Sequence, residues 1–267
     1  MPEKMKVFIL DHGYGGADAN WFEAGINFAS AVDRNPSRMW KVNCFYSILI
    51  QHPTEGNILF DTGLPPREQF PEWVLSMMDF ELNEKYSLTN QLSLVGLTPE
   101  DINHVILSHL HMDHAGGIAL CKNAVVYVNR KEAESAFTTV MSTTDTVAHG
   151  FYFRNVVLSP VRQMIYLDED LELFPGVEVI NLPGHTAGTM GMILHLENHT
   201  IIETSDSCSL ESNYLGMPSS LVTDVAKARQ SVCKVHRLEK KYPNSQVWFS
   251  HDLEKFNELR HAPEYYC

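Results

Sequence analysis

The sequence predicts an α/β protein in which helices cover both faces of a sandwich of β-sheets. Apolar runs of strand length come first, and strands then alternate with helical segments, twice over along the chain. This order favours sheets covered by helices, because each element must bury its apolar face against another. The chain shows no internal repeat, no low-complexity tract and no linker. We therefore expect one domain over residues 1–267.

The N-terminal part is expected to form three strands. Its apolar runs of strand length are residues 6–10, 42–50 and 58–60. Pro53 and Gly56 predict a turn between the last two, which then form a hairpin ending at Asp61-Thr62-Gly63. The glycine-rich residues 11–16 predict a loop, and residues 17–40 a loop or a short helix.

The middle of the chain mixes helical and strand signals. Residues 64–80 carry apolar side chains at helical spacing, which predicts a loop or short helix that is either packed in the core or overhangs a site. Thr98-Pro99 predicts a helix start, because threonine can cap the first turn and proline fits the first helical position. A short buried strand over residues 104–107 should follow.

The second half is expected to alternate strands with helices. Its strand candidates are residues 124–128, 164–167, 177–182, 190–196, 200–204 and 246–249. Helices are predicted over residues 130–137 and within residues 219–242, which carry the strongest helical pattern of this half. Residues 138–160 lack periodicity, and we interpret them as an inserted loop or short helix that could cover a site.

Composition limits the possible partners. The formal net charge of −13 argues against nucleic acid and against an anionic membrane surface, because both attract a basic face. There is no run of about 18 apolar residues and no secretory signal. Five scattered cysteines without a C-x-x-C pair indicate reduced thiols. We expect a cytoplasmic protein that acts on a small molecule.

The segment from Ser108 to Gly117 concentrates side chains that bind metals. Its four candidate ligands are His109, His111, Asp113 and His114. Imidazole and carboxylate groups are ligands for zinc, manganese and iron, whereas an apolar core would leave such groups without partners. The spacing therefore predicts a metal site directly after the strand at residues 104–107.

Three more candidate ligands follow predicted strands. They are His185, Asp206 and His251. Functional groups gather where loops leave a rigid scaffold, so we expect these side chains to meet the first cluster. The complete set is too large for one tetrahedral zinc and suits two metals that share a carboxylate.

The spacing also suggests how the ligands divide between two metals. The first group is His109, His111 and His185, and the second is Asp113, His114 and His251. Side chains two residues apart in an extended segment point the same way, which pairs His109 with His111. Asp206 is the candidate bridge. Two metals about 3.5–4 Å apart can lower the pKa of a shared water from 15.7 towards about 7, which predicts attack by a bridging hydroxide on a carbonyl carbon.

The pattern H-x-H-x-D-H at residues 109–114 resembles the signature of the metallo-β-lactamase superfamily. The remaining motifs of that family match, in order, Asp61-Thr62-Gly63, Pro183-Gly184-His185-Thr186, Asp206 and Ser250-His251. The resemblance covers about residues 42–252. It implies an αβ/βα four-layer sandwich with a dinuclear site, usually zinc, in which Asp61 supports the ligand loops.

Within that superfamily the chain is most similar to the N-acyl homoserine lactone lactonases, and related to the 4-pyridoxolactonases. The resemblance implies a quorum-quenching hydrolase with two Zn²⁺ per chain, other divalent metals being possible, that opens a lactone ring. Asp113 would assist the leaving alkoxide and Asp206 would bridge the metals. The assembly is expected to be a monomer or a homodimer.

The expected substrate contacts are less complete. The lactonases carry a tyrosine three residues after the bridging aspartate, where this chain has Ser209. Tyr214 is a candidate replacement. The apolar wall for an acyl chain or ring is predicted to contain Trp21, Phe22, Phe70, Trp73, Met77 and Met112.

Other functions are compatible with the same candidate ligands. The same dinuclear site could act on an aromatic lactone, a thioester, a β-lactam or a phosphodiester. An iron redox site of the flavodiiron or persulfide-dioxygenase kind is the alternative from another class, although the flavodiiron pattern has glutamate where His111 stands. A non-catalytic binding protein is the last alternative, and the complete ligand set argues against it.

Overall fold

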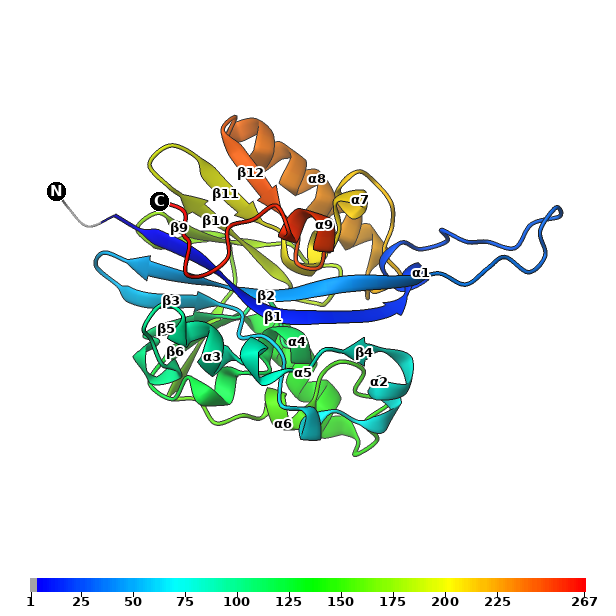
Figure 1. Ribbon diagram of the computed structural model, residues 1–267, viewed down its shortest axis with the longest axis horizontal. Coiled ribbons are helices and arrows are strands. Elements are labelled where there is room, and N and C mark those ends of the chain that lie inside the picture. Colours follow the sequence, from blue (N-terminus) through cyan, green and yellow to red (C-terminus); the bar gives the residue numbers. More distant parts are fainter. Residues whose placement is uncertain (1–3) are drawn as a thin grey trace.

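The computed structural model describes residues 4–267, in which two β-sheets pack face to face and helices cover their outer faces (Figure 1). Helices α3, α4 and α5 lie on the outer side of one sheet, and α8 covers the other. This is the αβ/βα four-layer sandwich that the family resemblance implied, with helices on both outer faces as the order of strands and helices predicted. Its strand order brings the candidate ligands to one edge of the sandwich.

The larger sheet has the order β4-β1-β2-β3-β5-β6-β7. Its strands are β1 (Lys6–Asp18), β2 (Trp40–His52), β3 (Gly56–Phe60), β4 (Asp79–Phe80), β5 (His104–Ile106), β6 (Val125–Asn129) and β7 (Gln163–Leu167). Strands β4, β1, β2 and β3 pair antiparallel, whereas β3, β5, β6 and β7 run parallel. The predicted hairpin is confirmed as β2 and β3.

The smaller sheet has the order β12-β11-β10-β9-β8. Its strands are β8 (Leu171–Phe174), β9 (Val177–Asn181), β10 (Met190–His195), β11 (Thr200–Glu203) and β12 (Ser245–Trp248). All its pairs are antiparallel except β11 with β12. Strand β8 was missed by the sequence analysis, because its side chains are mostly exposed and the run is short.

Helices connect and cover these strands. The two long ones are α5 (Arg130–Ser142) and α8 (Val225–Lys241). The short ones are α1 (Ala19–Phe22), α2 (Glu72–Met77), α3 (Leu88–Ser93), α4 (Met112–Ala115), α6 (Arg154–Val157), α7 (Glu211–Tyr214) and α9 (Leu253–Phe256). Among the described helices, none is long and apolar enough to cross a membrane.

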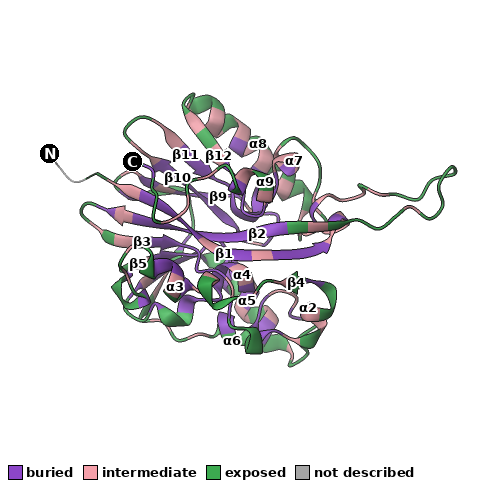
Figure 2. Cartoon of the chain, in the orientation of Figure 1, coloured by how far each residue is buried: buried purple, intermediate pink, exposed green. Residues whose placement is uncertain are grey.

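Alternation along the strands builds the core in layers (Figure 2). In β2, Ile48 and Ile50 face the smaller sheet, while Leu49 between them faces the helices beneath. Successive side chains of a strand point to opposite faces, so one buried strand supplies two layers. On the far side, Val235 of α8 packs against the outer face of the smaller sheet. The sheets are therefore buried on both faces.

Three expectations for local structure were wrong. The glycine-rich residues 11–16 are not a loop, because β1 continues through them with a register shift between Asp11 and Tyr14 and pairs with β2 along its length. Helix α5 continues through Ser142, so the insertion begins later than predicted. The helix after Thr98 is a single 3-10 turn, Pro99–Asp101, closed by hydrogen bonds of Thr98 to the Asp101 carboxylate.

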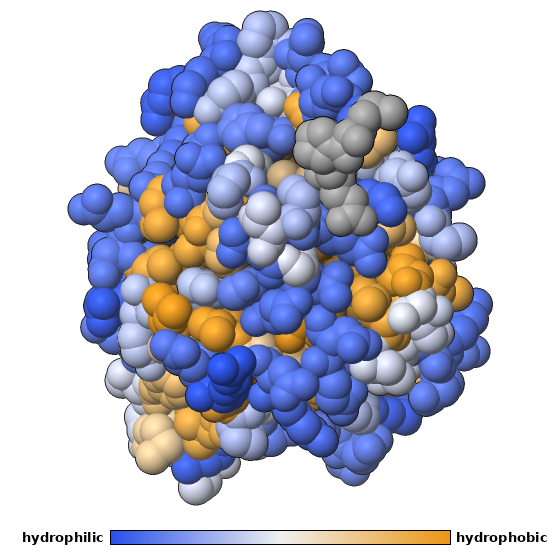
Figure 3. Space-filling view, turned by 90° about the vertical axis from the view of Figure 1, so that its left-hand side faces the viewer, coloured by the Kyte–Doolittle hydropathy of each residue, from blue (hydrophilic) through white to orange (hydrophobic). Residues whose placement is uncertain are grey.

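The end of the molecule at which β1 begins is mostly hydrophilic, with hydrophobic residues gathered in separate areas (Figure 3). At the opposite end, the chain between α1 and β2 projects from the body as a long loop (Figure 1). The pocket-lining helix α1 lies at the base of this loop.

His12, in β1, provides a pH-dependent contribution to stability. Its ring nitrogens bond the Ser47 hydroxyl at 2.7 Å and the Tyr86 carbonyl at 2.9 Å, and burial lowers its pKa to about 4. The unfolded chain would bind a proton near pH 6.5 that the folded chain does not, so the free energy of unfolding falls as the pH drops from about 6.5 to 4. The loss is expected to reach about 3 kcal/mol.

Urea unfolding between about pH 4 and 7.5, in the presence of a chelator, measures this effect. Replacing His12 by glutamine should flatten the profile, because glutamine does not titrate. Identical pH profiles for the two proteins would contradict the assignment.

Candidate metal centre and pocket

Four candidate ligands sit where the chain leaves β5 and enters α4. His109 and His111 precede the helix, and Asp113 and His114 lie within its single turn. The turn is fixed by Asp61, a buried residue whose carboxylate accepts hydrogen bonds from the Ser108 backbone N–H and hydroxyl, both at 2.7 Å. The same carboxylate contacts Nδ1 of His114 at 2.8 Å. Asp61 therefore orients a candidate ligand, as the resemblance implied.

Three more candidate ligands reach the same place from the smaller sheet. His185 follows β9, Asp206 lies in the 3-10 turn Ser205–Cys208 after β11, and His251 follows β12. Because these strands are neighbours or near neighbours in one sheet, their ends bring the side chains together across the sandwich edge. The structure thus assembles all the predicted ligands at one site.

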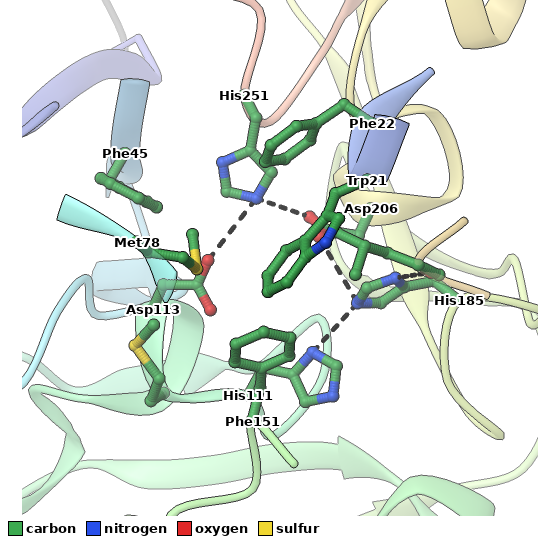
Figure 4. Close-up of a pocket in the computed structure, with 12 residues that line it drawn as sticks. Trp21, Phe22, Phe45, Met78, His111, Asp113, Phe151, His185, Asp206 and His251 are labelled. Atoms are coloured by element: carbon green, nitrogen blue, oxygen red, sulfur yellow. Dashed lines mark hydrogen bonds and ion pairs between the residues drawn. The ribbon is translucent and has the colours of Figure 1, made fainter. Parts of the chain in front are cut away.

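Asp206 lies at the centre of the cluster (Figure 4). Its Oδ1 is 3.2 Å from Nε2 of His114 and 3.1 Å from Nε2 of His251. Its Oδ2 is 3.4 Å from Nε2 of His185. Asp113 lies on the other side of the site, with Oδ2 3.6 Å from Nε2 of both His114 and His251. One carboxylate thus touches both halves of the cluster.

The candidate ligand atoms form three groups, and within each group all the atoms lie within 4.8 Å of one another. They are His109 with His111 and His185, Asp113 with His114 and His251, and His109 with His114 and Asp206. The first two are the groups expected from sequence spacing. The third connects them through Asp206, in the position expected of a bridging ligand.

The donor atoms fit divalent cations. Nε2 of His109 is buried and makes no hydrogen bond to any described residue. A buried nitrogen without a partner is unfavourable, and a metal ion would satisfy it. Burial, aided by the neighbouring imidazoles, lowers the pKa of His109 and His111 well below the usual value, which keeps both rings in the neutral form that binds metal.

The buried carboxylates of the ligand cluster also favour a positive charge within the site. Burial acts to raise the pKa of Asp206, but His251, His114 and His185 outweigh it and hold that pKa well below its usual value. Burial acts to lower the pKa of His114, but the carboxylates of Asp113, Asp206 and Asp61 outweigh it and raise that pKa. Metal ions would supply the positive charge that these buried carboxylates require.

Backbone carbonyls aim the remaining histidines. Nδ1 of His185 donates to the Leu221 carbonyl at 2.5 Å, and Nδ1 of His251 donates to the Cys44 carbonyl at 2.9 Å. Each bond turns Nε2 towards the other candidate ligands, and Nε2 of His185 lies 3.0 Å from Nδ1 of His111. The Ser250 hydroxyl donates to Oδ1 of Asp206 at 2.8 Å. Such outer contacts fix the orientation of metal ligands and raise their affinity.

Glu132, on α5, is a positioning residue that the sequence analysis missed. Its fully buried carboxylate accepts hydrogen bonds from the Leu110 N–H at 3.0 Å, the Gly188 N–H at 3.2 Å and the Tyr152 hydroxyl at 2.9 Å. One side chain thus joins the loop of His109 and His111, the loop after His185 and the insertion after α5. A glutamate in the first turn of a helix looks like a surface charge in the sequence, so no local signal marks it.

A narrow pocket leads to the candidate ligands and encloses about 30 Å³ of free space. Its apolar wall consists of Trp21, Phe22, Phe45, Met78, Met112, Phe151 and Leu221. This volume is far below the roughly 300–1,000 Å³ of typical small-molecule sites. A bulky substrate must therefore displace part of the wall, and the rings of Trp21 and Phe151, with centroids 5.8 Å apart, lie across the mouth (Figure 4).

The predicted wall is only partly the wall that the structure builds. Trp21, Phe22 and Met112 line the pocket. The other predicted residues do not line it. Phe70 is buried against Phe80 and Phe153, and Trp73 packs behind Phe151. Met77 is exposed, whereas Ser209 is buried and its carbonyl accepts a hydrogen bond from the His251 N–H. Met78 takes the place expected of Met77, because the helix ends between them and turns Met78 inward.

Tyr214 does not replace the tyrosine absent at Ser209. Its hydroxyl donates to the Glu239 carboxylate of α8, and its ring packs against His236 with centroids 4.0 Å apart. These contacts hold it outside the pocket. No tyrosine lines the pocket among the described residues. Phe151 lines the pocket but was not among the predicted wall residues. It lies in the insertion that was expected to cover the site.

Opening the pocket mouth should change which substrates enter. With the acyl lactones that the sequence resemblance implies as substrates, replacing Phe151 by alanine removes a ring that a long acyl chain would have to displace, so the ratio of kcat/KM for long-chain to short-chain lactones is expected to rise about tenfold. Initial rates on an acyl-length series measure this ratio. The matched control is Val147→Ala, an exposed position in the same insertion. An unchanged ratio in Phe151→Ala would remove this ring from the substrate path.

Comparisons with known proteins agree with this architecture. The family model for the metallo-beta-lactamase superfamily matches residues 46–202. The chain is 28% identical over 218 residues to N-acyl homoserine lactonase AiiA of Bacillus thuringiensis subsp. kurstaki, a match covering 79% of this chain and 82% of that protein. It is also 28% identical over 277 residues to the lactonase AiiB of Agrobacterium fabrum, covering 95% and 96% of the two chains.

Solved structures show the same likeness. An N-acyl homoserine lactone hydrolase with N-hexanoyl-L-homoserine bound at its catalytic metal centre superposes with a TM-score of 0.83, at 25% identity and with complete coverage of both chains. The dizinc quorum-quenching lactonase AidC shares the fold, with a TM-score of 0.69 and 17% identity over 95% of this chain and 89% of its own.

Proposed function

Because the chain belongs to the metallo-beta-lactamase superfamily, it is a metal-dependent hydrolase of the lactonase type, and we propose that its substrate is an N-acyl homoserine lactone opened at a dinuclear zinc site. The observation that carries this proposal is the position of Asp206 between two groups of ligands. A single carboxylate in contact with both groups suits two metals that act together on one ester bond.

The proposed metal ligands are those that meet at the cluster. His109, His111 and His185 would hold one ion, Asp113, His114 and His251 the other, and Asp206 would contact both. Bound zinc would lower the pKa of water and polarise the substrate carbonyl. Asp61 and Glu132 hold the ligand loops in place without facing the substrate.

The reaction adds one water across the ring C–O bond of the lactone and gives a hydroxy acid, with release of one proton at neutral pH. Asp113 is the residue proposed to hold a proton for the leaving alkoxide, since its carboxylate lines the pocket and its side chain keeps some solvent exposure. Trp21, Phe22 and Met112 would contact the acyl chain, together with Phe45, Met78, Phe151 and Leu221.

An aromatic lactone is the second candidate substrate. The wall is rich in aromatic rings, and none of the described residues that line it is a tyrosine whose hydroxyl could bind the carbonyl or amide of an acyl homoserine lactone. Aromatic rings favour flat partners in stacked or edge-on geometry. This observation favours a flat lactone over a β-lactam or thioester at the same site.

Metal analysis followed by a pH-indicator screen tests the proposal. We expect a colourless protein with about two zinc ions per chain that opens acyl homoserine lactones, and chelation should abolish the activity. Aromatic lactones, a thioester and a β-lactam are run beside them. Turnover of the thioester alone, or equal lactone turnover by chelated and zinc-loaded protein, would overturn the proposal.

A further inference from the structure

The loop between α1 and β2 exposes apolar side chains at its tip. We call residues 25–39 the arm. Phe28 is 81% exposed and Val32 is 98% exposed. The tip is a closed turn, in which the Ser30 N–H donates to the Asp33 carbonyl at 2.6 Å and the Asp33 N–H to the Ser30 hydroxyl at 3.0 Å. The turn is therefore formed, and the Phe28 ring lies against Gly25 of the arm itself, yet both large side chains of the tip remain mostly exposed to solvent.

The arm is joined to the body only near its base, as far as the described residues show. The Ala19 N–H donates to the Met39 carbonyl at 2.8 Å, and the Ala24 N–H donates to the Pro218 carbonyl at 2.6 Å. Beyond these bonds the arm extends away from both sheets (Figures 1 and 2). An exposed loop with this composition is unfavourable in an isolated molecule, because apolar groups remain in water.

A second exposed apolar patch lies at the base of the arm. Trp40, which is 54% exposed, and Val42 are two residues apart on β2 and so share one face of the strand. Val42 is aligned with Gly16 of β1, which is aligned in turn with the exposed Asp79 of β4. This base patch, formed by Trp40, Val42 and Asp79, is thus apolar with an acidic edge.

The tip and the base patch are complementary. Both present large apolar side chains, and the arm carries Arg34 and Arg38 against one carboxylate, Asp33, in a chain of net charge −13. The arm is therefore basic relative to the body of any copy of this chain. The tip points away from its own base patch, so one molecule does not satisfy both surfaces.

We propose that the arm is a dimerisation element, whose tip packs on the base patch of a second copy of this chain. A two-fold axis makes the contact reciprocal, because each copy offers one tip and one base patch. The exchange buries Phe28 and Val32 against Trp40 and Val42 in both directions. It also places Arg34 of one copy near Asp79 of the other.

Dimerisation also has a consequence for the pocket. The arm begins at residue 25, three residues after the end of α1, whose Trp21 and Phe22 line the pocket mouth. Fixing the arm in the dimer therefore restrains one wall of that mouth. This inference about assembly does not depend on which lactone is the substrate.

Light scattering after gel filtration of the full-length, zinc-loaded protein tests the proposal. At about 10 μM we expect twice the chain mass of 30.3 kDa. A tip variant, Phe28→Glu with Val32→Glu, and a base variant, Trp40→Lys with Val42→Lys, should each be monomeric. Met141→Glu, at an exposed apolar position on α5, is the matched control and should stay dimeric.

Mixing the two variants gives the sharper result. A heterodimer keeps one intact tip–base contact and pairs the glutamates of one copy with the lysines of the other, so an equimolar mixture should regain the dimer mass. Circular dichroism and zinc content confirm that each variant is folded. A monomeric wild type, a dimeric tip variant or a mixture that stays monomeric would overturn the proposal.

Discussion

Replacing Asp206 by alanine is expected to lower kcat/KM for the proposed lactone substrate by about a thousandfold or more, and to reduce the amount of bound metal. Asp206 is the carboxylate that contacts His114, His251 and His185 together, so its loss separates the two groups of ligands. Metal-based stabilisation of the reacting centre contributes several kcal/mol, and about 1.4 kcal/mol corresponds to a factor of ten in rate.

Metal analysis and steady-state kinetics on the purified variant measure both effects. Asp206→Asn separates charge from size, because it keeps the shape and loses the carboxylate. Asp168→Asn is the matched control, since that carboxylate pairs with the exposed Arg130 on the surface and is expected to contribute little. Full zinc content and unchanged kcat/KM in Asp206→Ala would mean that the reaction does not use this cluster.

Replacing Glu132 is expected to have the second largest effect, on metal affinity and on stability together. In Glu132→Ala, the N–H groups of Leu110 and Gly188 and the Tyr152 hydroxyl lose their acceptor. Each buried donor left without a partner costs about 1–3 kcal/mol, so the free energy of unfolding should fall by about 3 kcal/mol or more.

Glu132→Gln distinguishes positioning from simple stability. The amide keeps one acceptor oxygen but turns the other towards the donors as an N–H₂ group, which displaces the ligand loops without emptying the site. Zinc affinity is expected to fall about 10–100-fold, as is typical when an outer contact of a metal ligand is lost. Chelator competition measures this affinity. Glu134→Gln, at an exposed position on the same helix, is the control, and equal zinc affinity in the two variants would contradict the role of Glu132.

Much of the candidate metal centre could be predicted because its signals are local. The cluster from His109 to His114 lies in six consecutive residues, and the strand before it is a plain apolar run. His185, Asp206 and His251 each follow such a run, and the ends of strands in one sheet meet at one edge. Placing the ligands therefore required only the strand boundaries and the order of the layers.

The substrate wall could not be predicted in the same way. Phe70 and Phe151 are both aromatic residues in irregular segments, yet only Phe151 reaches the pocket, because Phe70 is held by Phe80 and Phe153. Tyr214 is close to Asp206 in sequence, but Glu239 on α8 holds its hydroxyl elsewhere. These outcomes depend on neighbours that lie far away along the chain.

The full length of β1 could not be predicted from local sequence signals either. Residues 11–16 contain glycines that indicate a loop, but β2 offers a complete row of hydrogen-bond partners and extends β1 through them. Long-range pairing thus overrides a local turn signal.

By itself, the sequence predicted the set of candidate ligands, their division into two groups and the layered α/β fold, because these predictions rest on residue spacing within short segments and on apolar runs of strand length. Only the tertiary structure decided which aromatic residues close the pocket, which buried glutamate holds the ligand loops, and that the arm presents an unpacked tip. Those features arise where segments distant in sequence compete for the same volume and the same hydrogen-bond partners, and that competition is resolved only by packing of the complete chain.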